Sequence, residues 1–323
     1  MAAAPTDFAR HAAGALAALP PACRPWGRGW CGALAGILEA AAAKPGNVHP
    51  GASFPDLSFA DLAAAAIAIA PALDAAAARP LGETVLDAVR ASRSATPSNA
   101  NLGIVLLLAP LAAVPDDEPP APASLCAAVE AVLAGAGPRD AALVWEAIAL
   151  ARPGGLGTSD RWDVAGPPPA DIRAAMRHAA PRDAIASLWA FGYEPLVAGP
   201  VADIAAGIDD GLGLEAAIVR GHLRQLARRP DSLIARRHGA DVAAEVSATA
   251  ADVVAAESSP AWEPAVAEFD RRLRQPRRLN PGTTADLVAA ALYILLRDGR
   301  PRPALPFPTP PLPQDQASPP SPP

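Results

Sequence analysis

The sequence predicts an all-α protein, a single multi-helix domain with a central polar cleft. Alanine-rich stretches recur along the 323 residues, and aromatic residues make up only 4% of them. Alternating patterns of β-branched residues are scarce, whereas apolar residues recur at helical spacing. We expect a cleft because polar loops of related chemistry separate the predicted helices.

We expect the helical catalytic domain to occupy residues 26–300. Residues 1–25 are rich in alanine and proline and show no clear period, which predicts a loosely ordered segment. Residues 301–323 contain eleven prolines, too many for a packed element. We therefore expect a disordered or extended polyproline tail.

Charge and apolar patterning argue against some classes of function. The formal net charge is −6, and the sequence has no lysine- or arginine-dense face, which argues against nucleic acid as a main partner. The three cysteines, Cys23, Cys31 and Cys126, lack metal-ligand spacing and favour a reduced compartment. The apolar run at 62–73 is too short to span a bilayer and contains Pro71. We predict a cytoplasmic protein without a membrane partner; the oligomeric state stays open and admits a homodimer.

The helices are predicted from apolar periodicity and from start and stop signals. Leu34, Ile37 and Leu38 place an apolar face on the first helix, which ends in a lysine before a Pro-Gly-Asn turn. Ser58 and Asp61 have the spacing of a capping box that opens the second helix. Apolar faces at helical spacing predict the others. The expected ranges are about 30–43, 58–69, 81–93, 104–111, 124–134, 138–152, 170–178, 181–191, 201–207, 212–228, 240–256, 261–274 and 280–296.

The loop after the first helix holds Lys44, Asn47 and His49, which are a cation, an amide and an imidazole. A lysine is a compact charge suited to phosphate, and Gly46 permits another group to approach the backbone closely. Glu39 lies about a turn and a half earlier on the helix, within reach of the same space. An ordinary helix end with a solvated lysine is the alternative interpretation.

Polar side chains also stand directly before two apolar helices. Asn99 and Asn101 precede one buried helix, and Asn280, Thr283 and Thr284 open the last helix. A helix N-terminus with free backbone N–H groups and short polar side chains is a ready site for an anion. A simple capping role for Asn101 is an equally good interpretation of the first segment.

Glycines and arginines mark two other loops. Gly154 and Gly155 lie in the polar loop 153–164 beside Asp163, where glycines permit close approach of a ligand. Because this loop follows a helix and not a strand, it is not a dinucleotide-binding fingerprint. Arg236 follows an apolar anchor in an arginine-rich segment, a placement suited to clamping phosphate. Most such clusters are solvated helix ends, which is the alternative.

Together these segments resemble the triphosphoribosyl-dephospho-CoA synthase family over most of the predicted helical domain. Each segment is ordinary alone, but six in this order form a specific signal. The residues that carry the resemblance are Glu39 with Lys44-Pro45-Gly46-Asn47, Asp56 with Phe59 and Asp61, Asn99-Ala100-Asn101-Leu102-Gly103, Pro153-Gly154-Gly155-Leu156-Gly157 with Asp163-Val164, Asp231-Ser232-Leu233-Ile234-Ala235-Arg236, and Asn280-Pro281-Gly282-Thr283-Thr284-Ala285-Asp286-Leu287.

The resemblance implies an all-α pentosyltransferase that uses ATP and 3′-dephospho-CoA. In this family the 2′-hydroxyl of dephospho-CoA attacks the anomeric carbon of the ATP ribose, and adenine leaves. The product is the precursor of the prosthetic group of citrate lyase and malonate decarboxylase. Displacement at an anomeric carbon passes through an oxocarbenium-like state that nearby carboxylates stabilise. The triphosphate requires Mg²⁺ on oxygen ligands.

This chemistry and the resemblance together imply roles for individual residues. Glu39, Asp56 and Asp61 are the catalytic candidates, and Glu39, Asp56 and Asp286 are the candidate Mg²⁺ ligands. Phosphate is expected at the lysine after the first helix, at Arg236 and at the start of the last helix. The expected substrate-binding residues are Lys44, Asn47, His49, Asn99, Asn101, Gly154, Gly155, Asp163, Arg236, Asn280, Thr283, Thr284 and Asp286.

The chain departs from citrate-lyase-type members in two loops. Those members carry a histidine-and-aspartate loop and a Thr-His-Lys-Gly-like segment where this chain has Ser53-Phe54-Pro55-Asp56 and Asn99–Gly103. A related transfer or hydrolysis on another phosphorylated cofactor precursor of one-carbon metabolism is therefore an alternative. A non-catalytic helical scaffold whose tail binds a partner is another. An enzyme requires the polar loops to meet in one cleft, whereas a scaffold leaves them apart.

Overall fold

We describe the protein from a computed structural model, which defines residues 27–97, 100–115 and 122–300. These residues form helices and loops without an extended strand, and the only paired extended residues are isolated bridges in the turns His49–Ala52 and Phe54–Leu57. The all-α prediction is confirmed. The expected N-terminal segment, the proline-rich tail and Asn99 lie outside the described residues.

The first half of the fold contains α2 (Arg28–Ala41), α3 (Phe59–Ala68), α4 (Ala70–Asp74), η2 (Ala76–Ala78), α5 (Leu81–Ala95), α6 (Leu102–Ala113), α7 (Pro122–Ala134) and α8 (Pro138–Ala151). The second half contains α9 (Ile172–Ala179), α10 (Ala184–Phe191), α11 (Glu194–Leu196), η3 (Val197–Val201), α12 (Ala202–Asp209), α13 (Leu214–Arg228), α14 (Ser232–His238), α15 (Ala240–Ala255), α16 (Trp262–Arg274) and α17 (Gly282–Arg297). The short elements α4, α11, η3 and α14 were not predicted, because a periodic pattern needs a longer window to show.

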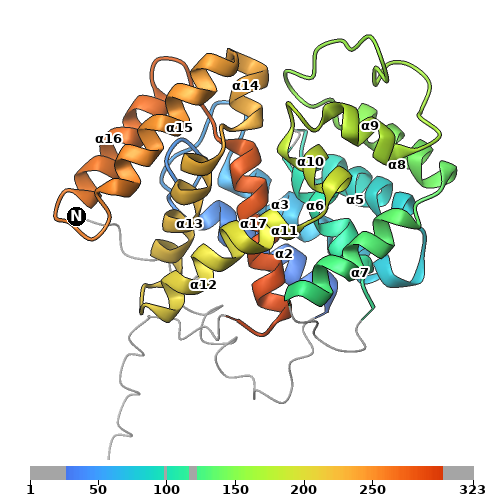
Figure 1. The fold of residues 1–323 in the computed structure, drawn as a ribbon, viewed down its shortest axis with the longest axis horizontal. Coiled ribbons are helices and arrows are strands. Elements are labelled where there is room, and N and C mark those ends of the chain that lie inside the picture. The colour runs from blue at the N-terminus through green and yellow to red at the C-terminus, as the bar shows by residue number, and fades with distance from the viewer. Residues whose placement is uncertain (1–26, 98–99, 116–121, 301–323) are drawn as a thin grey trace, which may run out of the picture. The chain divides into compact units, whose positions relative to one another are not determined.

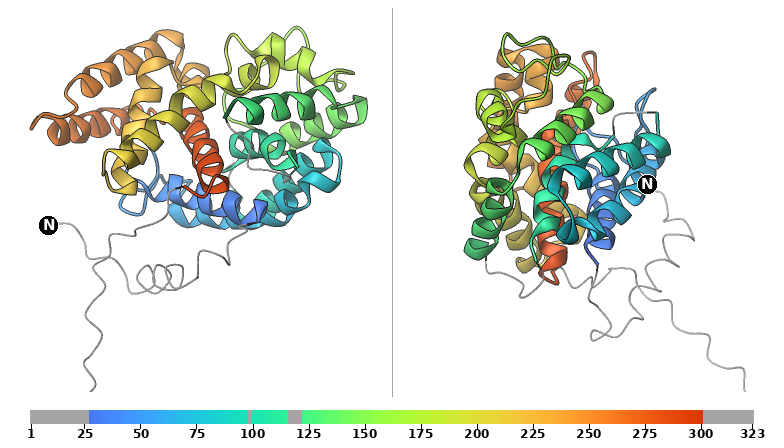
Figure 2. Two further views of the ribbon diagram at one scale, coloured as in Figure 1. Left: turned by 60° about the horizontal axis from the view of Figure 1, so that its bottom comes forward. Right: turned by 90° about the vertical axis from the view of Figure 1, so that its right-hand side faces the viewer.

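The last helix, α17, lies between two groups of helices. Figures 1 and 2 show it, in red, between α12–α16 on one side and α5–α10 on the other. It contacts α2, α6, α13 and α14, and apolar residues cover most of its circumference. A helix that is apolar on nearly all sides is stable only when it is buried on nearly all sides. The sequence of α17 therefore fixes its place in the middle of the fold.

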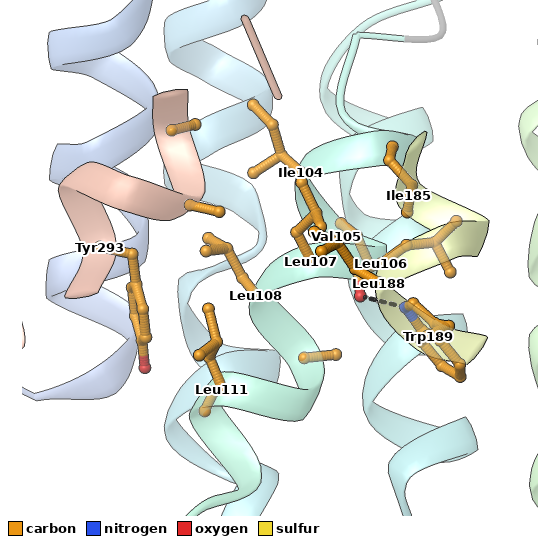
Figure 3. Packing of buried hydrophobic residues seen from close by; sticks show 14 of the residues in the cluster. Ile104, Val105, Leu106, Leu107, Leu108, Leu111, Ile185, Leu188, Trp189 and Tyr293 are labelled. Atoms are coloured by element: carbon orange, nitrogen blue, oxygen red, sulfur yellow. Dashed lines mark hydrogen bonds between the residues drawn. The ribbon is translucent and has the colours of Figure 1, made fainter. Parts of the chain in front are cut away.

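Helix α6 supplies the other buried centre, with Ile104, Leu107 and Leu108 among its core residues (Figure 3). Pro110 within this helix has no N–H, so the carbonyl of Leu106 loses its intrahelical partner. The indole Nε1 of Trp189 on α10 donates to that carbonyl oxygen at 2.8 Å. This hydrogen bond satisfies a buried acceptor and attaches α10 to α6.

One segment of the described chain, Phe59–Ala78, is long and apolar enough to cross a membrane by length and composition. This corrects the expectation that no apolar run reaches that length. The segment is divided into α3, α4 and η2, with Pro71 in the first turn of α4. Ile69 and Leu73 are fully buried against neighbouring helices. A single segment of this kind is weak evidence for a membrane span, because helices of other proteins meet the same criteria of length and composition.

Candidate active site

A cavity of about 1140 Å³ opens between the start of α17, the start of α6, α8–α10 and α14. Ligand pockets commonly measure roughly 300–1000 Å³, so this cavity is slightly larger than that range. Loops far apart in the sequence meet in its wall, as the enzyme hypothesis requires. The predicted site residues in this wall are Glu39, Asn47, Asp56, Gly154, Gly155, Asp163, Arg236, Asn280, Thr283 and Asp286.

Buried Asp231 joins the starts of two helices beneath this cavity. Its carboxylate accepts the backbone N–H groups of Leu233 and Ile234 at the start of α14. It also accepts the backbone N–H of Thr284 at 2.7 Å and its hydroxyl at 2.8 Å, at the start of α17. These N–H and hydroxyl groups are occupied, so the expectation that Thr284 contacts phosphate is not supported. Thr283 remains in the cavity wall.

Asp286 is a cavity carboxylate without a hydrogen-bond or ion-pair partner in the described part of the chain. It lies in the wall beside Gly103. Burial raises the pKa of Asp286 well above its ordinary value, and the negative charges of Glu39 and Asp231 raise it further. A carboxylate in this state is suited to accepting a proton at the site.

Glu39 stands beside Asp286 in the wall and is held by Lys44. The ammonium of Lys44 pairs with Oε1 of Glu39 at 2.9 Å and donates to the backbone carbonyls of Glu39 and Ala42. Lys44 is fully buried and does not line the cavity. Because its N–H groups are used inside the protein, the expectation that Lys44 binds phosphate is corrected: it orients Glu39.

The loop that follows Lys44 is attached to the start of α17. The amide Nδ2 of Asn47 donates to Oδ1 of Asn280 at 2.7 Å, and both residues line the cavity. Gly46 has a φ of +77°, and a Cβ there would stand 2.8 Å from the carbonyl oxygen of Leu279. The group that approaches the backbone of Gly46 closely is therefore the carbonyl of Leu279 in the same chain. The buried Oδ1 of Asn47 has no donor within the described part of the chain.

Asp56 reaches the cavity from an exposed turn and forms an ion pair with Arg278, whose guanidinium lies 4.0 Å from the ring centre of Phe54. The hydrogen bond from Arg278 lowers the pKa of Asp56. Within the described ranges no group of three or more Asp, Glu, His or Cys side chains is placed to hold a metal ion. Of the three candidate Mg²⁺ ligands, Asp56 is engaged by Arg278 and Glu39 by Lys44, whereas Asp286 has no such partner among the described residues.

Three further predicted residues lie outside the cavity wall. Asp61 accepts from the backbone N–H and hydroxyl of Ser58, so it caps α3, and these bonds lower its pKa. The ring Nδ1 of His49 accepts from the N–H of Gly51 at 3.2 Å. Asn101 is buried at the start of α6 without a capping hydrogen bond from its side chain. We correct the catalytic expectation for Asp61, whose carboxylate serves the capping box.

Two acidic residues show how the loops of the site are fixed. Asp163 accepts the N–H groups of Ser159 and Ala165 at 2.9 and 2.8 Å, and thus closes the glycine-rich loop on itself. Asp183, which sequence reasoning missed, caps α10 and forms an ion pair with Arg236. An aspartate directly before an apolar run was the available signal for this cap. The pairing leaves Arg236 partly neutralised.

Comparisons with known proteins agree with this architecture. The family model of ATP:dephospho-CoA triphosphoribosyl transferase matches residues 26–302. A solved structure from Archaeoglobus fulgidus, assigned as a triphosphoribosyl-dephospho-CoA synthase, superposes with a TM-score of 0.57 at 24% identity. The match covers 73% of this chain and 98% of that one, and it shows the fold. A comparison with curated proteins finds no match. The family match spans most of the chain and sets the scaffold alternative aside, so this protein belongs to the ATP:dephospho-CoA triphosphoribosyl transferase family and is a transferase.

Proposed function

We propose that the protein transfers the triphosphoribosyl group of ATP to the 2′-hydroxyl of 3′-dephospho-CoA and releases adenine. Membership of the family supports transfer of this group. The observation that carries the assignment to this cavity is the carboxylate of Asp286, which lines the cavity and has no partner in the described residues. The neighbouring Glu39 adds a second carboxylate.

The reaction needs a proton acceptor and negative charge near the anomeric carbon. The hydroxyl oxygen forms a bond to the anomeric carbon of ATP while the bond from that carbon to adenine breaks. Adenine leaves with the bonding electrons, and the hydroxyl proton passes to Asp286. Positive charge develops on the ribose in the transition state, and a fixed carboxylate stabilises it. Lys44 holds Glu39 in the wall for this second task.

Mg²⁺ enters this proposal as part of the substrate MgATP. The described residues provide no three-ligand site, but Mg²⁺ bound to nucleotides keeps most of its contacts with phosphate oxygens and water. The ion reduces the negative charge that the triphosphate carries into the cavity. No step of the proposed reaction depends on a protein ligand to it.

Adenine release tests the proposal. Purified protein is incubated with MgATP, with and without dephospho-CoA, and adenine is quantified by chromatography while the acceptor product is weighed by mass spectrometry. We expect adenine and triphosphoribosylated dephospho-CoA to form together, and neither without the acceptor. Adenine formation that depends instead on a pterin or furan precursor of one-carbon metabolism, with dephospho-CoA inert, contradicts the proposed acceptor.

A further inference from the structure

The arginines of this protein divide into a large paired group and a small unpaired group. Within the described residues, four lack a side-chain hydrogen bond, ion pair or aromatic ring contact: Arg152, Arg182, Arg237 and Arg277. Three of these four, all except Arg277, line the cavity. A single unpaired arginine at a surface is common, but three unpaired arginines in the wall of one cavity indicate a binding site for an anionic ligand.

The three arginines come from separate parts of the chain. Arg152 follows the last turn of α8 with a φ of +49°, a left-handed conformation that few residues other than glycine adopt. Arg182 stands in the turn between α9 and α10, and Arg237 lies on α14. Figure 1 shows the long loop that joins α8 to α9 reaching toward α14, with α10 below the loop. The fold thus brings three cationic side chains to the same wall.

The glycine-rich loop is shaped around one of these guanidinium groups. A Cβ at Gly154 would stand 2.4 Å from Nη2 of Arg237, and a Cβ at Gly155 would lie 3.2 Å from its Cγ. Any side chain at position 154 would push the guanidinium aside. The glycines that we expected to admit a ligand therefore leave room for the side chain of Arg237.

The wall also carries acidic side chains, which decide where a polyanion can bind. Glu39 lies in the last turn of α2 and Asp286 near the start of α17, and an unshielded polyphosphate beside these carboxylates would be repelled. The other acidic side chains of the wall are largely engaged, since Asp56 pairs with Arg278, Asp183 pairs with Arg236 and Asp163 closes its loop through two backbone N–H groups. Asp160 is the exception, an exposed carboxylate in the same loop.

We propose that Arg152, Arg182 and Arg237 form the site that binds the polyphosphate chain of a substrate. Planar guanidinium groups make paired, charge-assisted hydrogen bonds to phosphate oxygens. Because the whole chain carries a net charge of −6, a polyanion must be held by such local groups. This inference rests on the proposed function, which supplies two substrates with polyphosphate chains, the triphosphate of ATP and the diphosphate of dephospho-CoA.

Binding measurements without turnover test the site. R152Q, R182Q and R237Q remove the charge and keep much of the side-chain length, and R277Q is the matched control because Arg277 is also exposed and unpaired but lies outside the wall. Calorimetry measures the affinity of each variant for inorganic tripolyphosphate, MgATP, dephospho-CoA and adenosine. A lost charge-assisted contact weakens binding by roughly tenfold or more.

We expect each of the three variants to weaken tripolyphosphate binding by about that factor and to leave adenosine binding unchanged, with R277Q behaving as wild type. If the affinity for MgATP falls in parallel, the site binds the triphosphate. If only the affinity for dephospho-CoA falls, the site binds the diphosphate, and both results support the proposal. Wild-type affinity for all three anions in all three variants overturns it. Tight MgATP binding without adenine release would refute the proposed reaction and leave the anion site intact.

Discussion

The carboxylate of Asp286 lies directly against Gly103, so closely that a Cβ at position 103 would stand 2.0 Å from Oδ2. Real Cβ atoms do not approach an oxygen this closely, so a side chain at 103 would displace the carboxylate or the helix that carries it. Gly103 lies in the first turn of α6 and ends the polar segment Asn99–Gly103, which we expected to bind a ligand. Because Gly103 has no side chain, it leaves the space that the carboxylate of Asp286 occupies in the cavity wall.

The variant G103A should therefore lose activity while it keeps its fold. A shift of about 1 Å in a reacting group can cost on the order of 100-fold in rate, and we expect a loss of that size or more in adenine release. Circular dichroism and thermal unfolding check that the helices remain. The control is G137A, because a Cβ at Gly137 meets no atom within 4 Å. Full activity in G103A would show that the place of the Asp286 carboxylate does not matter.

The pH dependence of stability should reveal the state of Asp286. Its pKa is raised in the folded protein, so the folded state binds a proton more tightly than the unfolded state. Stability then falls as pH rises from the unfolded pKa of about 4 through the raised folded pKa. D286N removes this pH-dependent loss of stability. We expect the variant to be more stable than wild type at neutral pH, and the two proteins to have nearly the same stability at pH 4.

Urea unfolding at both pH values measures this difference, and D56N provides a comparison of opposite sign. The pKa of Asp56 is lowered by Arg278, so its stabilising contribution is present above the unfolded pKa and is lost as pH falls through the folded pKa. D56N should be slightly less stable than wild type at neutral pH, by a small amount because the pair is exposed. A D286N variant less stable than wild type at neutral pH would mean that Asp286 is ionised and paired in the folded protein.

Replacement of Lys44 should lower the free energy of unfolding and should not act directly on the affinity for ATP. K44M leaves Glu39 buried without its counterion, and breaking a buried pair costs about 3–5 kcal/mol. The control R90A breaks the exposed pair with Glu146 and should cost about 1 kcal/mol or less. Urea unfolding gives both values. A K44M protein of normal stability with a raised KM for ATP would restore Lys44 as a phosphate ligand.

The sequence was sufficient for the longer helices, because apolar periodicity is a local property. The expectation that most of the polar loops meet came from their related chemistry and from the family resemblance. The sequence was insufficient for the direction of individual side chains. Lys44 looked exposed after an alanine-rich helix, and only the packing of Glu39 and α13 around it shows that it points inward. Arg152 and Arg182 were not singled out from the sequence, because the wall that they share is built from distant segments.

The enzyme should need Mg²⁺ because its proposed substrate is MgATP, and this requirement should not depend on Asp56. We expect chelation by EDTA to abolish adenine release and added Mg²⁺ to restore it, because MgATP is the proposed substrate. D56N should need the same Mg²⁺ concentration as wild type for half-maximal activity, since Arg278 already engages the Asp56 carboxylate. A tenfold higher Mg²⁺ requirement in D56N would place Asp56 at the metal.

Single-turnover adenine release by D286N is the most direct test of the role given to this cavity. Enzyme in excess over ATP is mixed with saturating dephospho-CoA, and MgATP affinity is measured separately by calorimetry. Removal of a general base typically costs 10²–10⁴-fold, so we expect a rate constant lower by roughly that factor with MgATP affinity within about twofold of wild type. A D286N enzyme that releases adenine at the wild-type rate would contradict the assignment of the reaction to the Asp286 carboxylate.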